Sequence, residues 1–184
     1  MLRQLVDRAR QGDEEAFGAL ARTVGDRCMA IAFRILRDAD QAEDAVQTAF
    51  VAAWRELPAL RDSDRFEPWL HRMLVNACYA EARRSRRWAA NIRALPLDGA
   101  TAPNDILTID DRDQLERGLR RLPIDQRAVL VFHHYLGLSL PEVADRLGIP
   151  LGTAKSRLHY ASVALRSSLE ADERTPSLSQ ERPA

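Results

Sequence analysis

Cysteine is scarce in this sequence of 184 residues, because Cys28 and Cys78 are the only two. A pair so far apart, each within an apolar helical pattern, does not predict a disulfide scaffold and favours a reducing cytoplasm. Neither cysteine has a histidine or another cysteine nearby at metal-ligand spacing, so no metal site is expected. We therefore interpret both thiols as buried and chemically inert.

Long apolar runs are also missing. No stretch approaches the ~18 consecutive apolar residues of a membrane span, although 46% of the residues are apolar and can form a core. The first residues, MLRQLVDRAR, contain an early acid and no apolar region, so they do not predict a secretory signal. We expect no membrane insertion.

Signatures of catalysis are absent as well. The sequence has no glycine-rich phosphate loop, no nucleophile motif and no carboxylate cluster in a recognisable context. His133 and His134 are adjacent, which is a poor arrangement for holding a metal ion. The sequence therefore predicts neither an enzyme nor a cofactor.

No alternating apolar pattern is long enough to predict a strand, and almost every apolar pattern has helical spacing. We predict an all-α protein of two small helical domains joined by a linker, the C-terminal one a helix-turn-helix. The linker is expected where the periodicity fails around LPLDGATAPND. The predicted boundaries are 1–90 for the first domain, 91–109 for the linker, 110–170 for the second domain and 171–184 for a disordered tail.

Capping residues, glycine and proline predict where helices start and stop in the first domain. The expected order is an opening helix closed by Gly12, a helix capped by Asp13, a third from Asp26 to Leu36, a fourth starting at Asp40 with Glu43, and a fifth from Pro68 to about Trp88.

The fifth helix is strongly basic, since residues 71–93 carry a net charge of +5 in a chain whose net charge is zero. Its buried side is predicted to be Trp69, Met73, Ala77 and Ala80. The other surfaces carry arginine, amide and aromatic groups, which suit the phosphates and bases of nucleic acid. The alternative is a solvated arginine run at a domain edge.

Residues 94–126 are acidic, with a net charge of −3. If this segment faced the basic helix, it would favour a compact form in which the protein covers its own nucleic-acid surface. This arrangement is a hypothesis, and an extended scattering profile at low salt would contradict it.

The fourth helix has an unusual polar side. Its apolar stripe is Val46, Phe50, Ala53, Trp54 and Leu57. The opposite side carries Asp44, Gln47, Thr48, Val51 and Arg55. A solvated helix usually has more charge, so this mixed face could be a protein-docking surface; an ordinary solvated face is the alternative.

The stretch from Ser139 to Leu169 predicts two helices joined by a tight turn. Ser139 with Glu142 is a capping-box signature, and Gly148 and Pro150 form the turn. The second helix has one buried stripe, composed of Ala154, Leu158, Ala161 and Leu165. Its opposite face carries small hydroxyls, a cation and amphipathic rings, which can read base edges and hold phosphates. The alternative is an ordinary helical hairpin with a polar face.

Three segments occur in one order: AEDAVQTAFVAAW, FEPWLHRMLVNACYAEARRSRR and LPIDQRAVLVFHHYLGLSLPEVADRLGIPLGTAKSRLHYASVALR. Together they resemble the bacterial extracytoplasmic-function (ECF) sigma factors over about residues 10–170. The resemblance implies an RNA polymerase specificity subunit that recognises −35 and −10 promoter elements, promotes promoter melting and has no catalysis of its own. It implies core RNA polymerase (β′ clamp helices and β flap), promoter DNA and an anti-sigma factor as partners.

The resemblance also implies roles for three sets of residues. Polymerase binding falls on Asp44, Gln47, Val51 and Arg55. Contact with the −10 element falls on Asp64, Arg65, Phe66, Arg72, Asn76, Tyr79, Arg83 and Arg84, with the loop Asp62–Phe66 receiving a flipped non-template base. Contact with the −35 element falls on Thr153, Lys155, Ser156, Arg157, His159 and Tyr160. The chain departs from the family pattern at Thr48, Glu67 and Tyr160, where members often carry Glu, Arg and Arg.

An alternative function is an autonomous helix-turn-helix regulator whose first domain senses a signal or dimerises. Under that interpretation the basic helix over 68–88 would be a second nucleic-acid surface without a purpose.

Overall fold

The computed structural model describes residues 1–94 and 111–173, and every regular element in these two ranges is helical. The all-α prediction is therefore confirmed. The α-helices are α1 (Leu2–Ala9), α2 (Glu14–Leu36), α3 (Ala39–Glu56), α4 (Phe66–Ala94), α5 (Asp111–Arg121), α6 (Ile124–Leu130), α7 (Leu140–Leu147) and α8 (Leu151–Glu173). Two 3-10 turns, η1 (Leu57–Ala59) and η2 (Ser63–Arg65), precede α4, and a π-helical turn, η3 (Val131–Tyr135), follows α6. The predicted linker and tail lie outside the described residues, except that 91–94 belong to α4 and 171–173 to α8.

One long helix, α2, stands where two were predicted. Asp13 caps it as expected, because its carboxylate accepts a hydrogen bond from a first-turn backbone N–H at 2.9 Å. The predicted start at Asp26 is wrong. A glycine such as Gly25 costs a helix about 1 kcal/mol relative to alanine, and continuous burial on both sides of it outweighs that cost. The buried stripe is Ala16, Leu20, Val24, Cys28, Ile31 and Ile35.

The start of α3 also differs from the prediction. Asp38 caps the helix, because its carboxylate accepts a hydrogen bond from the backbone N–H of Gln41 at 2.9 Å. Asp40, the predicted start, lies in the first turn, where a negative charge is favourable next to the unpaired N–H groups. Both aspartates suit a helix N-terminus, so the pattern alone could not choose between them.

The central helix, α4, begins at Phe66 and ends at Ala94, so it is longer at both ends than predicted. Pro68 lies in its first turn, where the missing N–H would have no partner in the helix. The prediction of its buried side is wrong: Ala77 is buried, but Trp69 and Met73 are only half-buried and Ala80 is exposed. The residues buried along α4 are Phe66, Leu70, His71, Leu74, Val75, Ala77 and Cys78.

The helix-turn-helix is confirmed in its local details. The Glu142 carboxylate accepts hydrogen bonds from the backbone N–H of Ser139 at 2.8 Å and from its hydroxyl at 2.6 Å. Gly148 ends α7 with a φ of 65°, a left-handed conformation that favours glycine. On α8, Ala154 and Ala161 are fully buried against the rest of the second domain.

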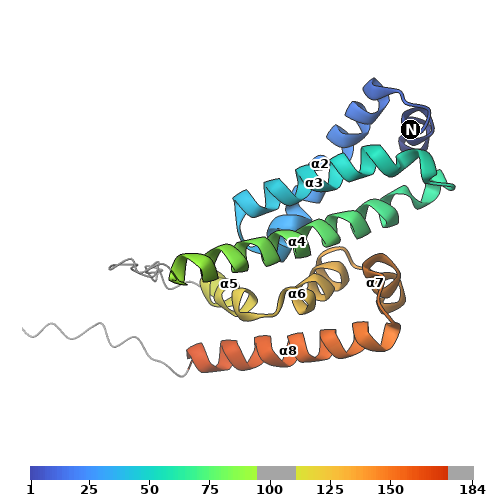
Figure 1. Ribbon diagram of the computed structural model, residues 1–184. Coiled ribbons are helices and arrows are strands. Elements are labelled where there is room, and N and C mark those ends of the chain that lie inside the picture. Colours follow the sequence, from blue (N-terminus) through green and yellow to red (C-terminus); the bar gives the residue numbers. More distant parts are fainter. Residues whose placement is uncertain (95–110, 174–184) are drawn as a thin grey trace, which may run out of the picture.

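Figure 1 shows α4 in the middle of the molecule, with α1–α3 on one side and α5–α8 on the other. The apolar core is continuous across this boundary, since buried side chains of η3 and α7 belong to the same cluster as those of α2, α3 and α4. The contact explains why α4 buries two sides: one faces its own domain and the other faces the second domain.

Candidate nucleic-acid and protein interfaces

The mixed face of α3 borders an apolar groove that it shares with α2. The groove has a volume of about 530 Å³, and Gln47, Val51 and Arg55 lie along it. Val51 is 47% exposed and places an apolar side chain on the open side of this groove. Asp44 is exposed but does not line this groove; it forms an ion pair with Arg84 of α4 at 2.8 Å.

Sequence reasoning missed the other wall of the groove, which α2 supplies. Phe17 and Ala21 lie on that wall, and the Phe17 ring lies 4.9 Å from the Trp54 ring, centroid to centroid. The signal was present in the sequence, because an apolar pair at i and i+4 stands beside the buried stripe of α2. An exposed groove with aromatic walls and polar ends is suited to receiving an apolar side of another protein.

The predicted base-capture loop lies between η1 and α4. Asp64 and Arg65 are exposed, whereas Phe66 is 1% exposed and belongs to the core. Beside them is a pocket of about 180 Å³ whose walls include Arg65, Trp69 and Arg72. Aromatic and guanidinium groups are the ones on which nucleic-acid bases stack. Asp145 of α7, which belongs to the second domain, also lines this pocket.

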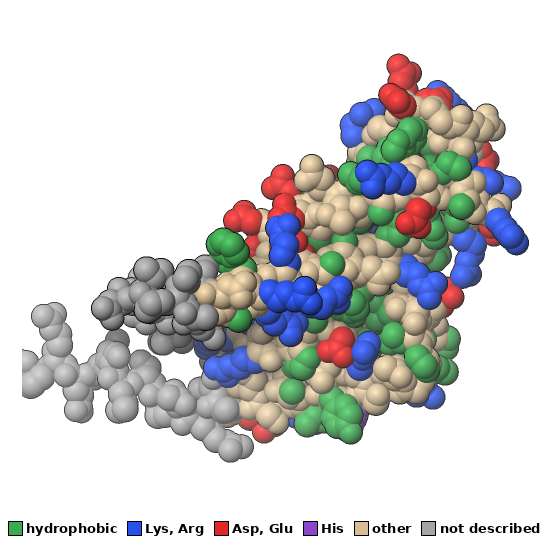
Figure 2. Space-filling view, in the orientation of Figure 1, with side chains coloured by type: hydrophobic (Ala, Val, Ile, Leu, Met, Phe, Trp, Pro, Cys, Tyr) green, Lys and Arg blue, Asp and Glu red, His purple; other side chains and the backbone are tan. Residues whose placement is uncertain are grey.

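Further along α4, the predicted reading residues Asn76, Arg83 and Arg84 are exposed. Arg86 and Arg87 extend the same basic region. Figure 2 shows Lys and Arg side chains gathered over α4 in this view. This half of the helix therefore offers positive charge to a nucleic-acid backbone.

Two predicted reading residues of α4 meet the second domain: Arg72 touches it but stays exposed, and Tyr79 is partly covered. The guanidinium of Arg72 lies directly against Gly148, with no room for a methyl group between them. The hydroxyl of Tyr79 is buried and has no hydrogen-bond partner among the described residues. Burial raises the pKa of Tyr79 to about 12, and the nearest charges, Arg157 and Asp125, belong to the second domain.

Polar contacts join the two domains around this covered surface. Arg146 of α7 donates a hydrogen bond to Nδ1 of His71 at 2.8 Å, and Arg65 pairs with Asp145 at 2.9 Å. The His71 ring also meets the Phe132 ring edge-on, with centroids 5.5 Å apart. The two domains are thus in contact within the described part of the chain.

The groups that hold the domains together differ from those in the hypothesis that the acidic segment faces the basic helix. Glu116, from the acidic segment, pairs with Arg37 of α2 rather than with the basic helix. Asp125, from the same segment, pairs with Arg157 of α8 at 3.0 Å. Among the described residues, the domains are therefore joined by apolar burial, by contacts of α7 with α4 and by the pair of Arg37 with Glu116.

The predicted reading face of α8 is mostly open. Lys155, Ser156, His159 and Tyr160 are exposed, and Tyr160 is 62% exposed. Thr153 is half-buried. These side chains lie on the first turns of the helix, which begins after the Gly148 turn. The exception is Arg157, which is half-buried and engaged by Asp125.

No metal or cofactor site emerges from residues 1–94 and 111–173, which contain no group of three acidic, histidine or cysteine side chains able to hold a metal ion. Cys28 and Cys78 are buried and unpaired, and burial raises their pKa values to about 11 and about 12. The thiols are therefore protonated at neutral pH, as expected of inert cysteines. Within the same two ranges, no helix is both long and apolar enough to cross a membrane.

Two family models match the chain. Sigma-70 region 2 matches residues 20–88, which span most of α2, all of α3 and most of α4. Sigma-70 region 4 matches residues 112–165, which include the helix-turn-helix. The matched ranges thus contain the α3 side of the groove, most of the basic helix and the exposed face at the start of α8.

The known proteins similar to this chain include several sigma factors. The ECF RNA polymerase sigma factor SigL of Mycobacterium tuberculosis is 35% identical over 86% of this chain and 94% of its own length. The RNA polymerase sigma-H factor of Pseudomonas aeruginosa is 30% identical over 91% and 93%. Among solved structures, CnrH in complex with the cytosolic domain of CnrY is 27% identical with a TM-score of 0.65, covering 93% of this chain and 98% of that one. The sigma factor RpoE bound to the anti-sigma factor NepR, from Bartonella quintana, is 25% identical with a TM-score of 0.65, covering 85% and 98%.

Proposed function

Because the chain belongs to the ECF sigma factors of bacterial RNA polymerase, we propose that three exposed surfaces divide polymerase docking and promoter recognition among them. As a sigma factor, it binds core RNA polymerase and promoter DNA in transcription initiation. The observation that carries the division is that three surfaces are separate. One is an apolar groove on α2 and α3, and the other two are polar helix faces with Arg or Lys side chains, on α4 and α8. The first domain (1–90) then serves polymerase and the −10 element, and the second (110–170) serves the −35 element.

Polymerase docking is assigned to the groove between α2 and α3. Gln47, Val51 and Arg55 contribute polar and apolar contacts from α3, and Phe17 contributes an aromatic wall. An aromatic-lined apolar centre with a polar rim has the composition of a protein interface. The β′ clamp helices are the partner that the family resemblance suggests.

Reading of the −10 element is assigned to the loop before α4 and to the exposed arginines of α4. The pocket beside Arg65, Trp69 and Arg72 supports capture of one flipped base. Flipping a base costs a few kcal/mol, and stacking in such a pocket offsets part of that cost. Arg83 and Arg84 can then hold the strand and duplex phosphates.

Reading of the −35 element is assigned to the start of α8. Its exposed hydroxyl, imidazole and phenol groups, on Ser156, His159 and Tyr160, can reach base edges in the major groove. Lys155 is the exposed cation beside them. Few cations on this face imply weak, salt-sensitive binding by the second domain alone.

The compact arrangement must open for the −10 surface to work. Arg72 and Tyr79 lie against the second domain, so DNA and that domain compete for them. Core polymerase would hold the domains apart by binding each one separately. An anti-sigma factor would favour the closed form; the complex of the sigma factor RpoE with the anti-sigma factor NepR supports a partner of this kind.

The chain has no catalytic step of its own in this proposal, and it works in the cytoplasm, where the polymerase transcribes. Its effect on rate comes from binding energy that positions and melts DNA for the polymerase.

The decisive test is in vitro transcription with core polymerase and a library of promoter fragments, with and without this protein. Initiation that requires the protein and two elements at fixed spacing is the expected result. If core polymerase stays silent while the protein alone protects a DNA site, the autonomous-regulator alternative replaces this proposal.

The groove is tested separately by Gln47→Ala with Val51→Asp, two exposed positions on α3. Polymerase affinity should fall by at least tenfold, since a charge replaces an apolar contact at the interface centre. Glu43→Ala, exposed on the same helix outside the groove, is the matched control. Asp44→Ala is less clean because it also removes one of the two ion pairs that Arg84 makes on the protein surface, the other being with Glu81. Unchanged polymerase binding by the double variant would refute the groove assignment.

The division between promoter elements is tested on α8. Alanine at Ser156, His159 or Tyr160 should change the preferred −35 sequence and leave the preferred −10 sequence unchanged. Equal loss at both elements would contradict the assignment.

A further inference from the structure

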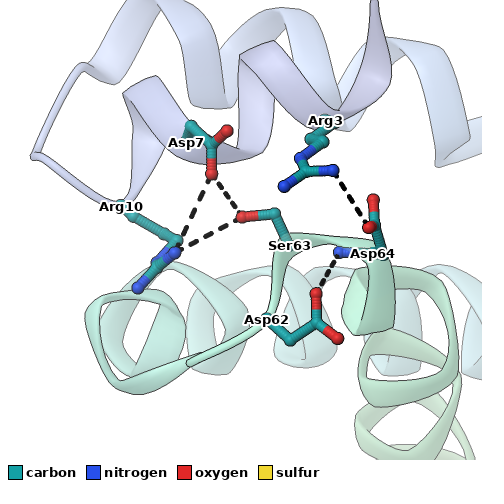
Figure 3. A network of polar contacts seen from close by, with 6 residues as sticks. All are labelled: Arg3, Asp7, Arg10, Asp62, Ser63 and Asp64. Carbon is teal, nitrogen blue, oxygen red and sulfur yellow. Dashed lines mark hydrogen bonds and ion pairs between the residues drawn. The ribbon is translucent and has the colours of Figure 1, made fainter.

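The first helix, α1, has two distinct sides. Its apolar side packs on α2, with Val6 and Ala9 fully buried. Its polar side carries Arg3, Asp7 and Arg10, which are spaced i, i+4 and i+7 and therefore lie on one face. Figure 3 shows these three side chains directed at the turn before α4, η2.

The contacts converge on Ser63, the first residue of that turn. Its hydroxyl donates a short hydrogen bond to the carboxylate of Asp7 and accepts one from Nη1 of Arg10 at 3.4 Å (Figure 3). Arg10 and Asp7 also pair with each other at 3.8 Å. A hydroxyl that must donate in one direction and accept in another is confined to one rotamer, so α1 fixes the position of Ser63.

The turn has few other supports. Leu60 and Phe66 are buried and anchor its two ends, but between them only Ser63 is buried, at 8% exposure. Within the turn, the Asp62 carboxylate accepts a hydrogen bond from the backbone N–H of Asp64 at 2.9 Å. The backbone N–H of Arg65 also donates to the carbonyl of Asp62 at 3.1 Å, and the Arg65 side chain pairs with Asp145 of α7. Ser63 is the buried point between the two anchors, so the contacts that hold Ser63 restrict the exposed residues around it.

A weaker contact reinforces the same link. Arg3 pairs with Asp64 at 3.1 Å, and both side chains are about two-thirds exposed (67% and 63%). Exposed pairs contribute little, so the half-buried contacts of Asp7 and Arg10 dominate. Packing of α1 on α2 requires neither of these polar residues, because it uses the opposite side of the helix.

We propose that Asp7 and Arg10 are positioning residues for −10 recognition, and that α1 holds the base-capture turn in its binding conformation before DNA arrives. The inference rests on the proposed function of that turn. A turn that is already ordered loses less conformational freedom when a flipped base binds, so affinity and base discrimination both increase. Residues that never touch DNA would thus set how well the chain tells one base from another.

The test uses full-length protein bound to core polymerase and single-stranded non-template oligonucleotides. One oligonucleotide carries the −10 sequence that the parent selects, and the other has an abasic site at the captured position. The parent should prefer the intact base. Asp7→Ala should reduce that preference about tenfold, the usual effect of removing one partner of a partly buried charged hydrogen bond, and leave affinity for the abasic oligonucleotide unchanged.

Three further variants separate positioning from general damage. Asp7→Asn keeps an oxygen that accepts from Ser63 and should give an intermediate loss. Ser63→Ala removes only the hydroxyl and decides the matter if Asp7→Ala does not fold. Arg8→Ala removes an arginine of α1 that pairs with Asp13 at 2.8 Å, away from the turn, and should match the parent.

The outcomes are distinct for the two proposals. If Asp7→Ala and Ser63→Ala keep the parent's preference for the intact base, the positioning role is refuted and base capture stands. If the parent itself binds both oligonucleotides equally, base capture by this turn fails and the positioning role fails with it. A loss of polymerase affinity that matches the loss of DNA binding would also overturn the inference.

Discussion

The proposed DNA-reading surfaces of α8 and α4 differ in how much of each is exposed. On α8, Lys155, Ser156, His159 and Tyr160 are open to solvent. On α4, Arg72 lies against Gly148 and the hydroxyl of Tyr79 is buried, although the arginines further along are exposed. The closed molecule therefore presents one reading surface and withholds part of the other.

The difference follows from how many partners each helix has. The main contacts of α8 are with α5, α6 and α7 of its own domain, so one buried stripe is enough and most of the opposite face stays free. α4 packs on α2 and α3 on one side and on α6 and α7 on the other. A helix between two domains can have its function regulated by separating them, whereas a helix at the edge cannot.

Phe132→Ala should have the largest effect on this difference, because it weakens the core that covers one side of α4. Phe132 is fully buried in the core that joins the domains and meets His71 of α4. Truncating a buried phenylalanine costs about 3–5 kcal/mol. We expect that loss in the free energy of unfolding, measured in denaturant, together with faster amide hydrogen exchange along the side of α4 that faces the second domain.

Leu165→Ala is the matched control. Leu165 of α8 is half-buried beside Gly118 of α5, away from α4. This substitution should cost less and leave exchange in α4 at the parent's rate. Unchanged exchange in α4 after Phe132→Ala would mean that the shared core does not hold the domains together.

Acid should open the same boundary through His71, which is 3% exposed. Burial, followed by the positive charges of Arg146 and Arg27, lowers the pKa of His71 from 6.5 to about 4. The unfolded chain therefore takes up this proton at a higher pH than the folded one. Stability should be constant above about pH 6.5 and should fall as the pH drops to about 4, by roughly 3 kcal/mol for this residue.

The measurement is the free energy of unfolding in urea across that pH range, with His71→Gln as the comparison. The amide oxygen of glutamine can accept the hydrogen bond from Arg146 but does not titrate, so the fall should become shallower. His159→Gln, on the open face of α8, retains His71 and should keep the parent's slope. An identical slope in the parent and His71→Gln would show that the boundary does not sense acid through this histidine.

The sequence predicted the second domain better than the first. The capping box at Ser139, the stop at Gly148 and the stripe of α8 are local patterns, and the structure has all of them. For α4 the prediction chose the wrong side, because Trp69 with Met73 and Leu70 with Leu74 both have helical spacing. Periodicity cannot choose between two apolar sides when a helix has two partners.

Site residues that lie on the exposed face of a single helix could be predicted from the sequence. Contacts between two elements could not. The exposed residues of α8 and Val51 of α3 could be named from their own helices. Phe17 and Ala21 of α2 form a local apolar pair, but no local pattern shows that this pair faces α3 across the groove. The contact of Asp7 with Ser63 joins residues distant in the sequence, and no local pattern reports it. Burial of Tyr79 likewise depends on a domain that begins well beyond it.

The smallest expected effect is an increase in the free energy of unfolding, and it compares one tyrosine on α4 with one on α8. Tyr79→Phe removes a buried hydroxyl that has no hydrogen-bond partner among the described residues. Since a buried polar group without a partner is destabilising, the free energy of unfolding should rise by up to about 1 kcal/mol. Tyr160→Phe, the same change at an exposed position on α8, should leave it within about 0.5 kcal/mol of the parent.

The two Tyr→Phe variants should also differ in which promoter element they bind less well. Tyr79→Phe should weaken −10 binding, because the closed form becomes more stable and the open form loses a hydroxyl. Tyr160→Phe should alter only −35 binding. A Tyr79→Phe protein less stable than the parent would mean that the hydroxyl is paired in solution; α4 would then be held closed by a specific hydrogen bond rather than merely covered, and opening it would require breaking that bond.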